Sequence, residues 1–452
     1  MLYFQRLNPD RGWGETWEVL AEHPEHPPLY YVMARIASQF WGSSIATTRG
    51  LAVVISLLVF PAAYWLCWEL FADSRVGWWA IALVSVSPFH ILYAQEARQY
   101  SLWSVVTLLV CAAFWRAVKS EKPKLLDWLL YSVTLSLNFY SSLLSVLVAI
   151  AHFIYLIWTE KFTRVWLYFC GAGLIALLSF LPWLSILLLN SDKLEEQTHW
   201  MNMSEPFLVL YSLWELHLSS IWLDFPSQIN HFVAPRIFFL LLGGTIYVIH
   251  FLRNKPKERF FLLLIILVPL LGLILPDLIL GGRRSLMTRY FIPSLLGIQI
   301  SVSYWLAVNK WNKLKLLIIT LIISLGILSG LASNSAPTWW NKVVSYHNSM
   351  VAEVINASPK PLVISDDHEI NLGNLISLSH LLKDHVDLLL YPKSGILTIP
   401  EGYTDVFFYH PSPELASQVQ ENLEVVEELQ EFMNDGNPNS LLMRSSINVN
   451  HF

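Results

Sequence analysis

Phe260-Phe-Leu-Leu-Leu-Ile-Ile-Leu-Val-Pro-Leu-Leu-Gly-Leu-Ile-Leu275 is a run without one charged or hydrogen-bonding side chain. It lies inside an apolar segment, residues 259–281, that is long enough to cross a hydrocarbon core, which takes roughly 20 residues of helix. Similar runs recur from residue 46 to residue 333. Apolar residues make up 54% of the chain and charged residues only 14%, against about 25% charged in soluble domains. The sequence therefore predicts a polytopic α-helical membrane protein and excludes a soluble fold.

The apolar runs predict about ten membrane-spanning helices, with the turn near residues 140–142 as the weakest boundary. The predicted spans are 46–70, 76–93, 99–117, 125–141, 142–159, 165–189, 232–252, 259–281, 289–309 and 314–333. Between them, the long polar and aromatic segment 190–231 predicts a helix lying along the membrane surface, because its tryptophans favour the interface.

The basic residues between the spans predict the orientation. Five short loops hold 14 of them: Arg75; Arg116, Lys119, Lys122 and Lys124; Lys161 and Arg164; Arg253, Lys255, Lys257 and Arg259; Lys310, Lys313 and Lys315. The opposite loops hold about six. Since Lys-rich and Arg-rich loops remain cytoplasmic, both termini are expected outside the cytoplasmic membrane.

Residues 1–45 are interpreted as the remainder of a first extracytoplasmic loop with a juxtamembrane helix. They show no basic segment followed by an apolar core, the pattern of a signal peptide. An outside N-terminus without a signal leads us to expect a transmembrane helix ahead of this sequence.

Residues 334–452 differ in composition from the spans and predict a small extracytoplasmic α/β domain. Apolar clusters at 361–365, 387–391 and 405–409 are typical of buried strands. They alternate with helical patterns at 340–357, 371–385 and 412–432, and the tail after Asn434 is expected to be loose. The domain boundaries are therefore 1–45, 46–333 and 334–452.

The composition favours no metal site, no disulfide framework and no nucleic-acid partner. The three cysteines, Cys67, Cys111 and Cys170, lie in apolar runs and form no CxxC. His23 and His26 could bind a metal together, but two ligands do not make a site. No cofactor is expected; a divalent cation is conceivable, but nothing in the sequence supports one.

The unusual polar clusters all fall on the predicted outside face. The first is Glu22-His-Pro-Glu-His-Pro-Pro-Leu-Tyr-Tyr31, where prolines begin a new helix. Glu25 and His26 then lie just before a helix N-terminus, which attracts anions. The alternative is an ordinary solvated helix cap.

The second cluster, Ser87-Pro-Phe-His-Ile-Leu-Tyr-Ala-Gln-Glu-Ala-Arg-Gln-Tyr100, joins two spans by a short turn. It places Glu96, Arg98 and Tyr100 at or just inside the membrane surface. Ionisable groups at that depth are costly and tend to be paired or functional. The alternative is a Glu96–Arg98 pair that only solvates the turn.

The third cluster is Gly281-Gly-Arg-Arg-Ser-Leu-Met-Thr-Arg-Tyr290. Arg283, Arg284 and Arg289 lie on the predicted outside face, although basic residues usually favour the cytoplasmic loops. Guanidinium groups bind phosphate bidentately. A lipid-linked phosphate or pyrophosphate would suit them at headgroup depth. The alternative is contact with ordinary anionic membrane lipids.

These clusters resemble motifs of the GT-C superfamily of membrane glycosyltransferases. His26-Pro-Pro-Leu-Tyr-Tyr31 and residues 87–102 are similar to the branch with the protein mannosyltransferases, the aminoarabinose transferase of lipid A and the bacterial family-39 proteins. Arg289-Tyr-Phe-Ile-Pro293 looks like that branch's later Arg-Tyr-x-x-Pro element, and the resemblance covers roughly residues 20–310.

The resemblance implies transfer of a hexosyl or pentosyl group from a polyprenyl-phosphate-linked donor at the outer face. The acceptor would be a glycan, lipid or protein, and the sugar stereocentre would invert. Glu96 and His26 are then the candidate catalytic residues. The expected substrate-binding residues are Arg98, Tyr100, Arg289, Tyr290, Arg283, Arg284, Glu25 and Tyr30.

The sequence departs from the family in one motif. Members of the family carry an acidic motif, usually Asp-Glu, just after their first transmembrane helix, and the Asp of that motif is the expected catalytic base. Residues 1–26 contain no Asp-Glu, and Asp10 does not match. The sequence is therefore expected to lack that helix and its motif, and the chain could be an inactive fragment.

Two other classes of function remain open from the sequence. A lipid or glycan flippase would carry ionisable residues near mid-membrane and interrupted helices in paired halves, whereas the polar clusters here gather on one face. A non-catalytic membrane scaffold is the other alternative, and it would keep its function after mutation of Glu96 and Arg289.

Overall fold

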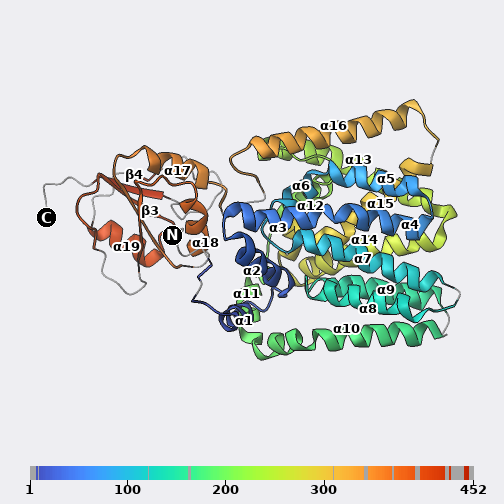
Figure 1. The fold of residues 1–452 in the computed structure, drawn as a ribbon. Coiled ribbons are helices and arrows are strands. Elements are labelled where there is room, and N and C mark those ends of the chain that lie inside the picture. Colours follow the sequence, from blue (N-terminus) through green and yellow to red (C-terminus); the bar gives the residue numbers. More distant parts are fainter. Residues whose placement is uncertain are drawn as a thin grey trace. The chain divides into compact units, whose positions relative to one another are not determined.

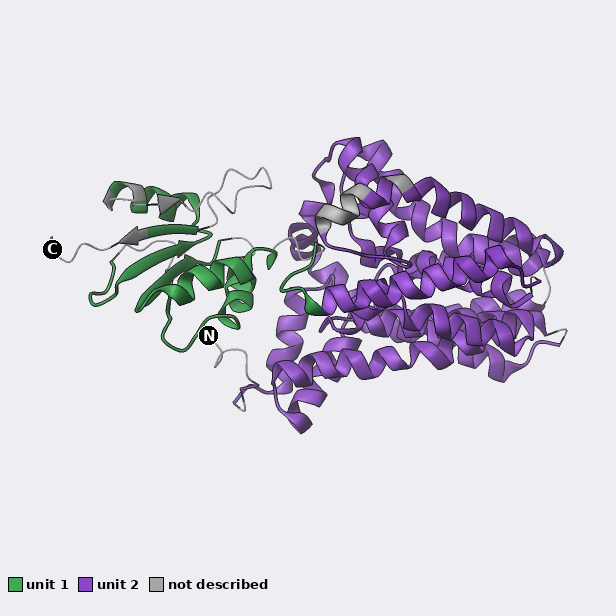
Figure 2. Cartoon of the chain, turned by 90° about the horizontal axis from the view of Figure 1, so that it is seen from above, with its two compact units in different colours: residues 1–6, 335–452 green, residues 7–334 purple. Residues whose placement is uncertain are grey.

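The computed structural model describes residues 7–8, 10–120, 122–160, 164–308, 310–340, 345–368, 371–391, 398–422, 427–428 and 442–446. The chain divides into two compact units, residues 7–334 and residues 1–6 with 335–452 (Figure 2). Each unit has its own hydrophobic core.

The first unit is a bundle of long apolar helices preceded by two short ones (Figure 1). Its helices before the long outer segment are α1 (Trp13–Glu22), α2 (Leu29–Trp41), α3 (Ile45–Leu57), α4 (Val59–Phe71), α5 (Ser74–Ser85), α6 (Pro88–Ala94), α7 (Tyr100–Lys119), α8 (Leu125–Phe139), α9 (Ser145–Thr159) and α10 (Arg164–Leu189). The rest of the unit holds α11 (Ser191–Thr198), η2 (His199–Asn202), α12 (Phe207–Ser219), α13 (Ser227–Phe251), η3 (Leu252–Asn254), α14 (Pro256–Leu280), η4 (Arg284–Leu286), η5 (Thr288–Phe291), α15 (Ile292–Val308) and α16 (Lys313–Ser335).

The polytopic membrane fold is confirmed, but the number of about ten spans is not. Among the described residues, seven helices are long and apolar enough to cross a membrane, or eight if α5 and α6 form one span bent by 66°. Helices α8 and α9 lie at two other predicted spans. Each is apolar but has only 15 residues, whereas a full span takes roughly 20 residues. Residues 190–231 form α11, η2, α12 and the start of α13 instead of one surface helix.

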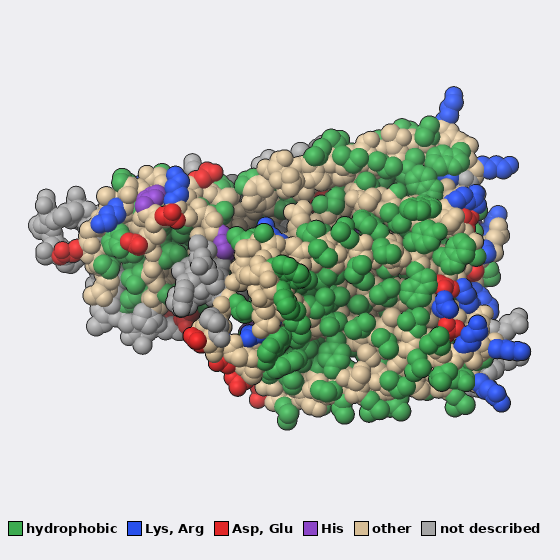
Figure 3. Space-filling view, in the orientation of Figure 1, with side chains coloured by type: hydrophobic (Ala, Val, Ile, Leu, Met, Phe, Trp, Pro, Cys, Tyr) green, Lys and Arg blue, Asp and Glu red, His purple; other side chains and the backbone are tan. Residues whose placement is uncertain are grey.

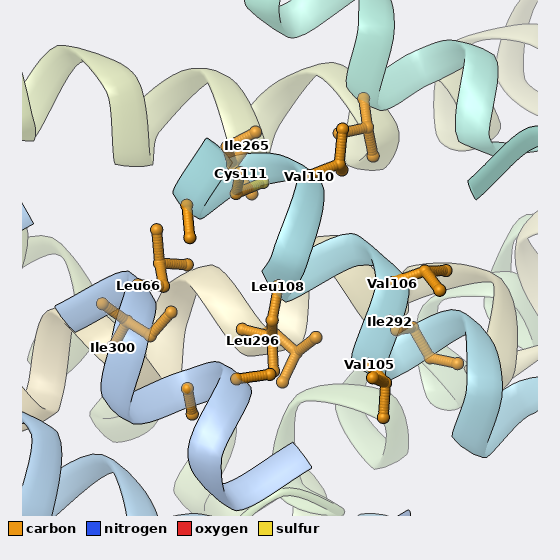
Figure 4. Close-up of a cluster of buried hydrophobic side chains, with 14 of the residues drawn as sticks. Leu66, Val105, Val106, Leu108, Val110, Cys111, Ile265, Ile292, Leu296 and Ile300 are labelled. Carbon is orange, nitrogen blue, oxygen red and sulfur yellow. The ribbon is translucent and has the colours of Figure 1, made fainter. Parts of the chain in front are cut away.

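The core of the bundle is built around α7 and α15, which are almost wholly buried, whereas α13 and α16 mostly face outward. Their burial follows from their sequences, because apolar or small residues occupy all sides of α7 and α15. Figure 4 shows side chains of α4, α7, α14 and α15 meeting in this core: Leu66, Leu108, Cys111, Ile265, Leu296 and Ile300. This packing fixes the ends of α7 and α15, where the candidate site lies.

The second unit contains helices on both faces of a five-stranded sheet, and the described part of that sheet follows the order β2-β1-β3-β5-β4. Strands β1 (Pro361–Asp366), β2 (Asp387–Tyr391) and β3 (Asp405–Tyr409) are parallel. The helices are α17 (Asn348–Ala357), α18 (Asn371–Ser379) and α19 (Pro413–Asn422). The three predicted strands are present at their predicted positions.

Two strands of this sheet contradict the sequence prediction for its end. β4 (Glu427–Glu428) lies within the segment 412–432 that was predicted as helix, and β5 (Leu442–Ser446) lies in the tail that was predicted to be loose. β5 pairs antiparallel with β3, and Arg444 forms an ion pair of 2.8 Å with Asp405 of β3. This long-range pairing stabilises a strand that has a weak local signal.

Candidate active site

The first polar cluster lies between α1 and α2, where two prolines set the start of α2. Pro27 and Pro28 cannot continue a preceding helix but suit the first turn of a new one, so α2 begins at Leu29. The backbone N–H of Leu29 donates to the carbonyl of Tyr140 at 3.2 Å, which anchors this turn to the end of α8. His26 and Tyr31 are thereby held close to the loop between α6 and α7.

Arg98 joins the first and second clusters. It lies in the short loop 95–99, and its Nη1 donates to His26 Nε2 and to the Tyr31 hydroxyl, both at 3.2 Å. The Tyr31 hydroxyl in turn donates to Gln99 Oε1 at 3.1 Å. Two motifs about 70 residues apart in sequence therefore share one hydrogen-bonded network.

His26 is neutral at neutral pH in this setting. Burial lowers the pKa of His26 to about 4, helped by the positive charges of Arg98 and Arg289 and by His23. Its Nε2 is therefore the acceptor for Arg98, and the proton of the ring is on Nδ1. Glu25 Oε1 lies 3.7 Å from the same Nε2, but an ion pair there would need the protonated imidazole.

Arg289 lies in η5, at the start of α15, and its guanidinium is held by aromatic faces. Its Cζ lies 5.3 Å from the ring of Tyr100 and 5.6 Å from the ring of Tyr290. Cations at this distance are attracted to the ring face. Its Nε is buried and has no hydrogen-bond partner among the described residues, so one donor of the guanidinium is left for a ligand.

The turn that carries Arg289 is fixed by His217 of α12. His217 Nε2 donates to the carbonyl of Ser285 at 3.1 Å, and its Nδ1 accepts from the Thr288 hydroxyl at 2.8 Å. Burial lowers the pKa of His217 to about 4, so the ring remains neutral and can accept at Nδ1. His217 thus positions the residue directly before Arg289.

One acidic and one hydroxyl side chain complete the cluster. Among the residues that the structure describes, Glu25 Oε2 and the hydroxyl of Tyr30 are buried without hydrogen-bond partners. Burial, together with the nearby Tyr31 and Glu96, raises the pKa of Tyr30 to about 12, so this hydroxyl keeps its proton. These two atoms are available to a ligand.

Arg283 and Arg284 already have carboxylate partners. Arg283 Nη1 lies 3.3 Å from Glu205 Oε1, and Arg284 Nη1 donates to Asp277 Oδ1 at 3.1 Å. The fully buried Asp277 carboxylate also accepts from the backbone N–H and the hydroxyl of Ser285, both at 2.7 Å. The structure therefore groups these two arginines with the end of α14, and it groups Arg289 with Tyr100 and Tyr290.

The cluster lies at the end of the bundle opposite the basic loops. Tyr100 begins α7, whereas Arg116 and Lys119 are in its last turn. Arg289 precedes α15, and Lys313 begins α16 after that helix ends. Figure 3 shows the lysines and arginines gathered at one end of the helical unit, beyond a wide apolar surface.

The arrangement can bind an anion between two cations and offers carboxylates nearby. Arg98 and Arg289 both act electrostatically on His26, so both charges lie in the neighbourhood of this residue. Glu25 and Glu96 stand beside them as candidate proton acceptors. In the part of the chain that the structure describes, no group of three or more His, Cys, Asp or Glu side chains could hold a metal ion.

Sequence reasoning identified most of this cluster but missed its connections. Glu25, His26, Tyr30, Glu96, Arg98, Tyr100, Arg289 and Tyr290 were all predicted site residues. Tyr31 and Gln99 were not, although both lie within the quoted motifs. The role of His217 could not be found, because its partners Ser285 and Thr288 are distant in sequence.

The comparisons with known proteins agree with this grouping of motifs. Residues 25–186, which carry the first two clusters, match the family described as dolichyl-phosphate-mannose-protein mannosyltransferase. The chain is 24% identical over 294 residues to an undecaprenyl phosphate-alpha-4-amino-4-deoxy-L-arabinose arabinosyl transferase of Pseudomonas savastanoi pv. phaseolicola, covering 61% of this chain and 50% of the relative. It is 30% identical over 171 residues to the enzyme of the same name from Pseudomonas paraeruginosa, covering 35% of this chain and 30% of the relative. The matches thus span half or less of these curated relatives.

The fold has a solved counterpart. The crystal structure of ArnT from Cupriavidus metallidurans bound to undecaprenyl phosphate superposes with a TM-score of 0.54 at 11% identity, over 94% of this chain and 88% of that one. At such low identity the likeness establishes the fold alone. The family match on the motif-bearing residues and the two curated relatives confirm the resemblance stated from the sequence, which is to the GT-C superfamily of membrane glycosyltransferases.

Proposed function

We propose that this protein transfers a sugar from a polyprenyl-phosphate-linked donor to a glycan, lipid or protein acceptor at the outer face of the cytoplasmic membrane. The observation that carries the proposal is the pair Arg98 and Arg289 at the end of the bundle opposite the basic loops, with Arg289 Nε unsatisfied. Guanidinium groups are the side chains best suited to bind a phosphate. The names of the curated relatives and the lipid bound to the solved ArnT structure point to the same class of donor.

In the proposed reaction, the residues of the cluster support a transfer in one step. The acceptor atom gives its proton to a carboxylate and attacks the anomeric carbon from the side opposite the phosphate, so that the stereocentre inverts. The bond between that carbon and the phosphate oxygen breaks, and its electron pair leaves with the lipid phosphate. Arg98 and Arg289 stabilise the charge that develops there.

Glu96 is the proposed proton acceptor, supported by its position in the loop that carries Arg98. It lies in the same loop as Arg98 and acts electrostatically on both arginines, on Tyr30 and on Tyr100. General-base catalysis contributes about 100-fold to 10,000-fold to a rate. His26 has the supporting role of orienting Arg98, since its Nε2 accepts from that side chain.

The test is a transfer assay on membranes that contain the protein. Radiolabelled polyprenyl-phosphate sugars are added, and label entering lipid, glycan or protein is measured for wild type and for Glu96→Gln. We expect transfer by wild type and a loss of roughly 100-fold or more in the variant. Arg11→Gln is the control, because Arg11 is an exposed arginine whose side chain forms an ion pair with Glu15 in the same segment.

Two outcomes would contradict the proposal. If wild type transfers label from none of the donors while the protein is folded, the glycosyltransferase activity is wrong for this chain. If wild type transfers and Glu96→Gln keeps the full rate, the role of Glu96 is wrong.

A further inference from the structure

The sheet of the second unit has a topological switch point between β1 and β3. In the order β2-β1-β3, the chain leaves β1 through α18 to reach β2 on one side and later forms β3 on the other side. Helix α18 shares a core with Val363 of β1, and α19, which follows β3, shares one with the next residue, Ile364. Because successive side chains of a strand point to opposite faces, α18 and α19 cover opposite faces. In open α/β sheets, ligands bind at such a point, beyond the carboxyl ends of the strands.

A carboxylate and an amide join the two strand ends at this switch point. Asp366, the last residue of β1, is 2% exposed, and its Oδ2 accepts from the backbone N–H of Ser412 at 3.0 Å. Asn371, the first residue of α18, donates through Nδ2 to the carbonyl of His410 at 2.9 Å and to the hydroxyl of Ser365 at 2.8 Å. The amide of Asn371 therefore lies between the chain that leaves β1 and the chain that leaves β3.

Two buried polar atoms at the switch point are available to a ligand. Asn371 is 4% exposed, and its Oδ1 has no hydrogen-bond partner among the described residues. Because this oxygen belongs to the same planar amide as Nδ2, it also lies between the two strand ends. In the same described ranges, Nε2 of His410 is buried without a hydrogen-bond partner. One atom from each side of the switch point is thus left for a polar ligand.

The backbone of His410 is held in a conformation that residues other than glycine seldom adopt. Its φ is 46°, in the left-handed region. Residues in such conformations cluster at ligand sites and persist where the surroundings hold them. Here the hydrogen bond from Asn371 to the His410 carbonyl holds the backbone, and the imidazole packs edge-on against the ring of Tyr409 with centroids 4.8 Å apart. These contacts position the imidazole.

The groups at the switch point suit a neutral ligand with several hydroxyl groups. A hydroxyl both donates and accepts, so it can pair with the amide oxygen of Asn371 and with a ring nitrogen of His410. Burial lowers the pKa of His410, and His347 adds to this effect, so the imidazole offers no positive charge to a phosphate at neutral pH. The carboxylates of Asp366 and Asp367 also oppose an anion. In the described part of the chain, no group of three or more His, Cys, Asp or Glu side chains could hold a metal ion.

We propose that the switch point of the second unit binds a sugar through Asn371 Oδ1 and His410 Nε2. The ligand reaches these atoms from the rim, where Asp367 is exposed and His410 and Pro411 are half-buried. The site belongs to a different unit from the cluster of Arg98 and Arg289. It is a binding site without bond-making chemistry, and it does not rest on the proposed function.

The test measures the binding of three free sugars to the purified full chain in nanodiscs by isothermal titration calorimetry. The probes are D-galactose, D-mannose and N-acetyl-D-glucosamine. His410→Gly removes the imidazole and suits the left-handed backbone, and His410→Asn tolerates the same backbone while it keeps a polar side chain. His380→Gly is the control, because His380 is an exposed histidine directly after α18, at the end of that helix opposite Asn371.

We expect wild type and His380→Gly to bind at least one of the three sugars with the same affinity. His410→Gly should bind that sugar about tenfold more weakly, the effect of losing a hydrogen bond at a buried site, and His410→Asn should recover part of the affinity. Thermal unfolding checks that each variant is folded. If wild type binds none of the sugars, or if folded His410→Gly binds them as wild type does, the inference is overturned.

Two further titrations test the ligand class and the location. Inorganic phosphate and Mg²⁺ are added to wild type and to His410→Gly, and binding of either that depends on His410, in place of sugar binding, would overturn the assignment to a sugar. Sugar binding should persist in Glu96→Gln, whose change lies in the helical unit. If Glu96→Gln abolishes sugar binding and His410→Gly keeps it, the sugar binds in the helical unit and the inference is wrong. A failed transfer assay would leave the sugar-binding result unaffected, so the two proposals fail separately.

Discussion

Six arginines on the outer side of the helical unit have contacts in the described part of the chain, and they differ in what holds them. Arg35 donates to the backbone carbonyl of Arg11 and lies over the ring of Trp13. Arg283 and Arg284 are held by carboxylates, and Arg11 is paired with Glu15. Arg98 is bonded to a neutral imidazole and a tyrosine hydroxyl, and Arg289 lies against tyrosine rings. These neutral groups orient the two guanidinium groups, and the Glu96 carboxylate acts electrostatically on both. Because Arg98 and Arg289 both act on His26, we assign the lipid phosphate to this pair.

His26 should make the stability of the protein depend on pH in a defined direction. Burial lowers its pKa from 6.5 to about 4 in the folded protein, so between these values the unfolded chain binds this proton more readily. The contribution of His26 to the free energy of unfolding is therefore fully present above pH 6.5 and is lost as the pH falls towards 4. By linkage it amounts to no more than roughly 3 kcal/mol.

The measurement is the unfolding temperature of the purified protein at pH 7.5, 6, 5 and 4.5. We expect wild type to lose more stability on acidification than His26→Gln, whose amide can accept from Arg98 but does not titrate. His23→Gln serves as the control, since His23 is half-exposed three residues earlier. Parallel curves for wild type and His26→Gln would contradict the neutral, Arg98-bound state of His26.

At the scale of elements, the bend between α5 and α6 is enclosed by close packing of α16. The chain turns by 66° where Pro88 begins α6, which leaves the carbonyl of Val86 outside a regular helix. Gly326 and Gly330 of α16 form a Gly-x-x-x-Gly pair, which permits close approach of helices in membranes. A Cβ atom on Gly326 would lie 2.3 Å from the Val86 carbonyl oxygen, whereas one on Gly330 would lie 3.4 Å from the end of the Ile91 side chain.

Gly326→Ala should therefore destabilise the protein and Gly330→Ala should not. Overpacking against backbone costs about 1–3 kcal/mol, because the carbonyl cannot rotate away as a flexible side chain can. Thermal unfolding in detergent compares the two variants with wild type. Equal unfolding temperatures for both variants would show that α16 does not pack this closely on the bend.

At the scale of the whole molecule, the sequence allowed the membrane fold to be predicted, and it singled out most residues that the structure brings together in the candidate site. A long apolar run is almost sufficient to predict a helix, because the backbone of a segment in hydrocarbon must form its hydrogen bonds within that segment. Glu96, Arg98 and Arg289 stood out because charge at the outer ends of spans is unusual. Their grouping with His26 depends on helix packing, which no local pattern encodes.

The differences between the sequence prediction and the structure also arise from tertiary contacts that local sequence patterns do not encode. β5 has only Leu442 and Met443 as apolar residues, and it is a strand because it pairs with β3 across the sheet. The bend at Pro88 divides a predicted span, and α8 and α9 have 15 residues each, so the predicted number of full spans is not confirmed. In each case tertiary contacts decided the outcome against the local signal.

The most direct test of the central claim is the rate of sugar transfer by Arg289 variants in nanodiscs that contain a polyprenyl-phosphate sugar. The account predicts that Arg289→Gln lowers turnover by about 100-fold to 1,000-fold, the usual cost of losing one group that stabilises a developing anion. Arg289→Lys should recover only part of the rate, because it keeps the charge but loses the planar fork and its Nε donor. Wild-type turnover in folded Arg289→Gln would contradict the claim that this arginine holds the departing lipid phosphate.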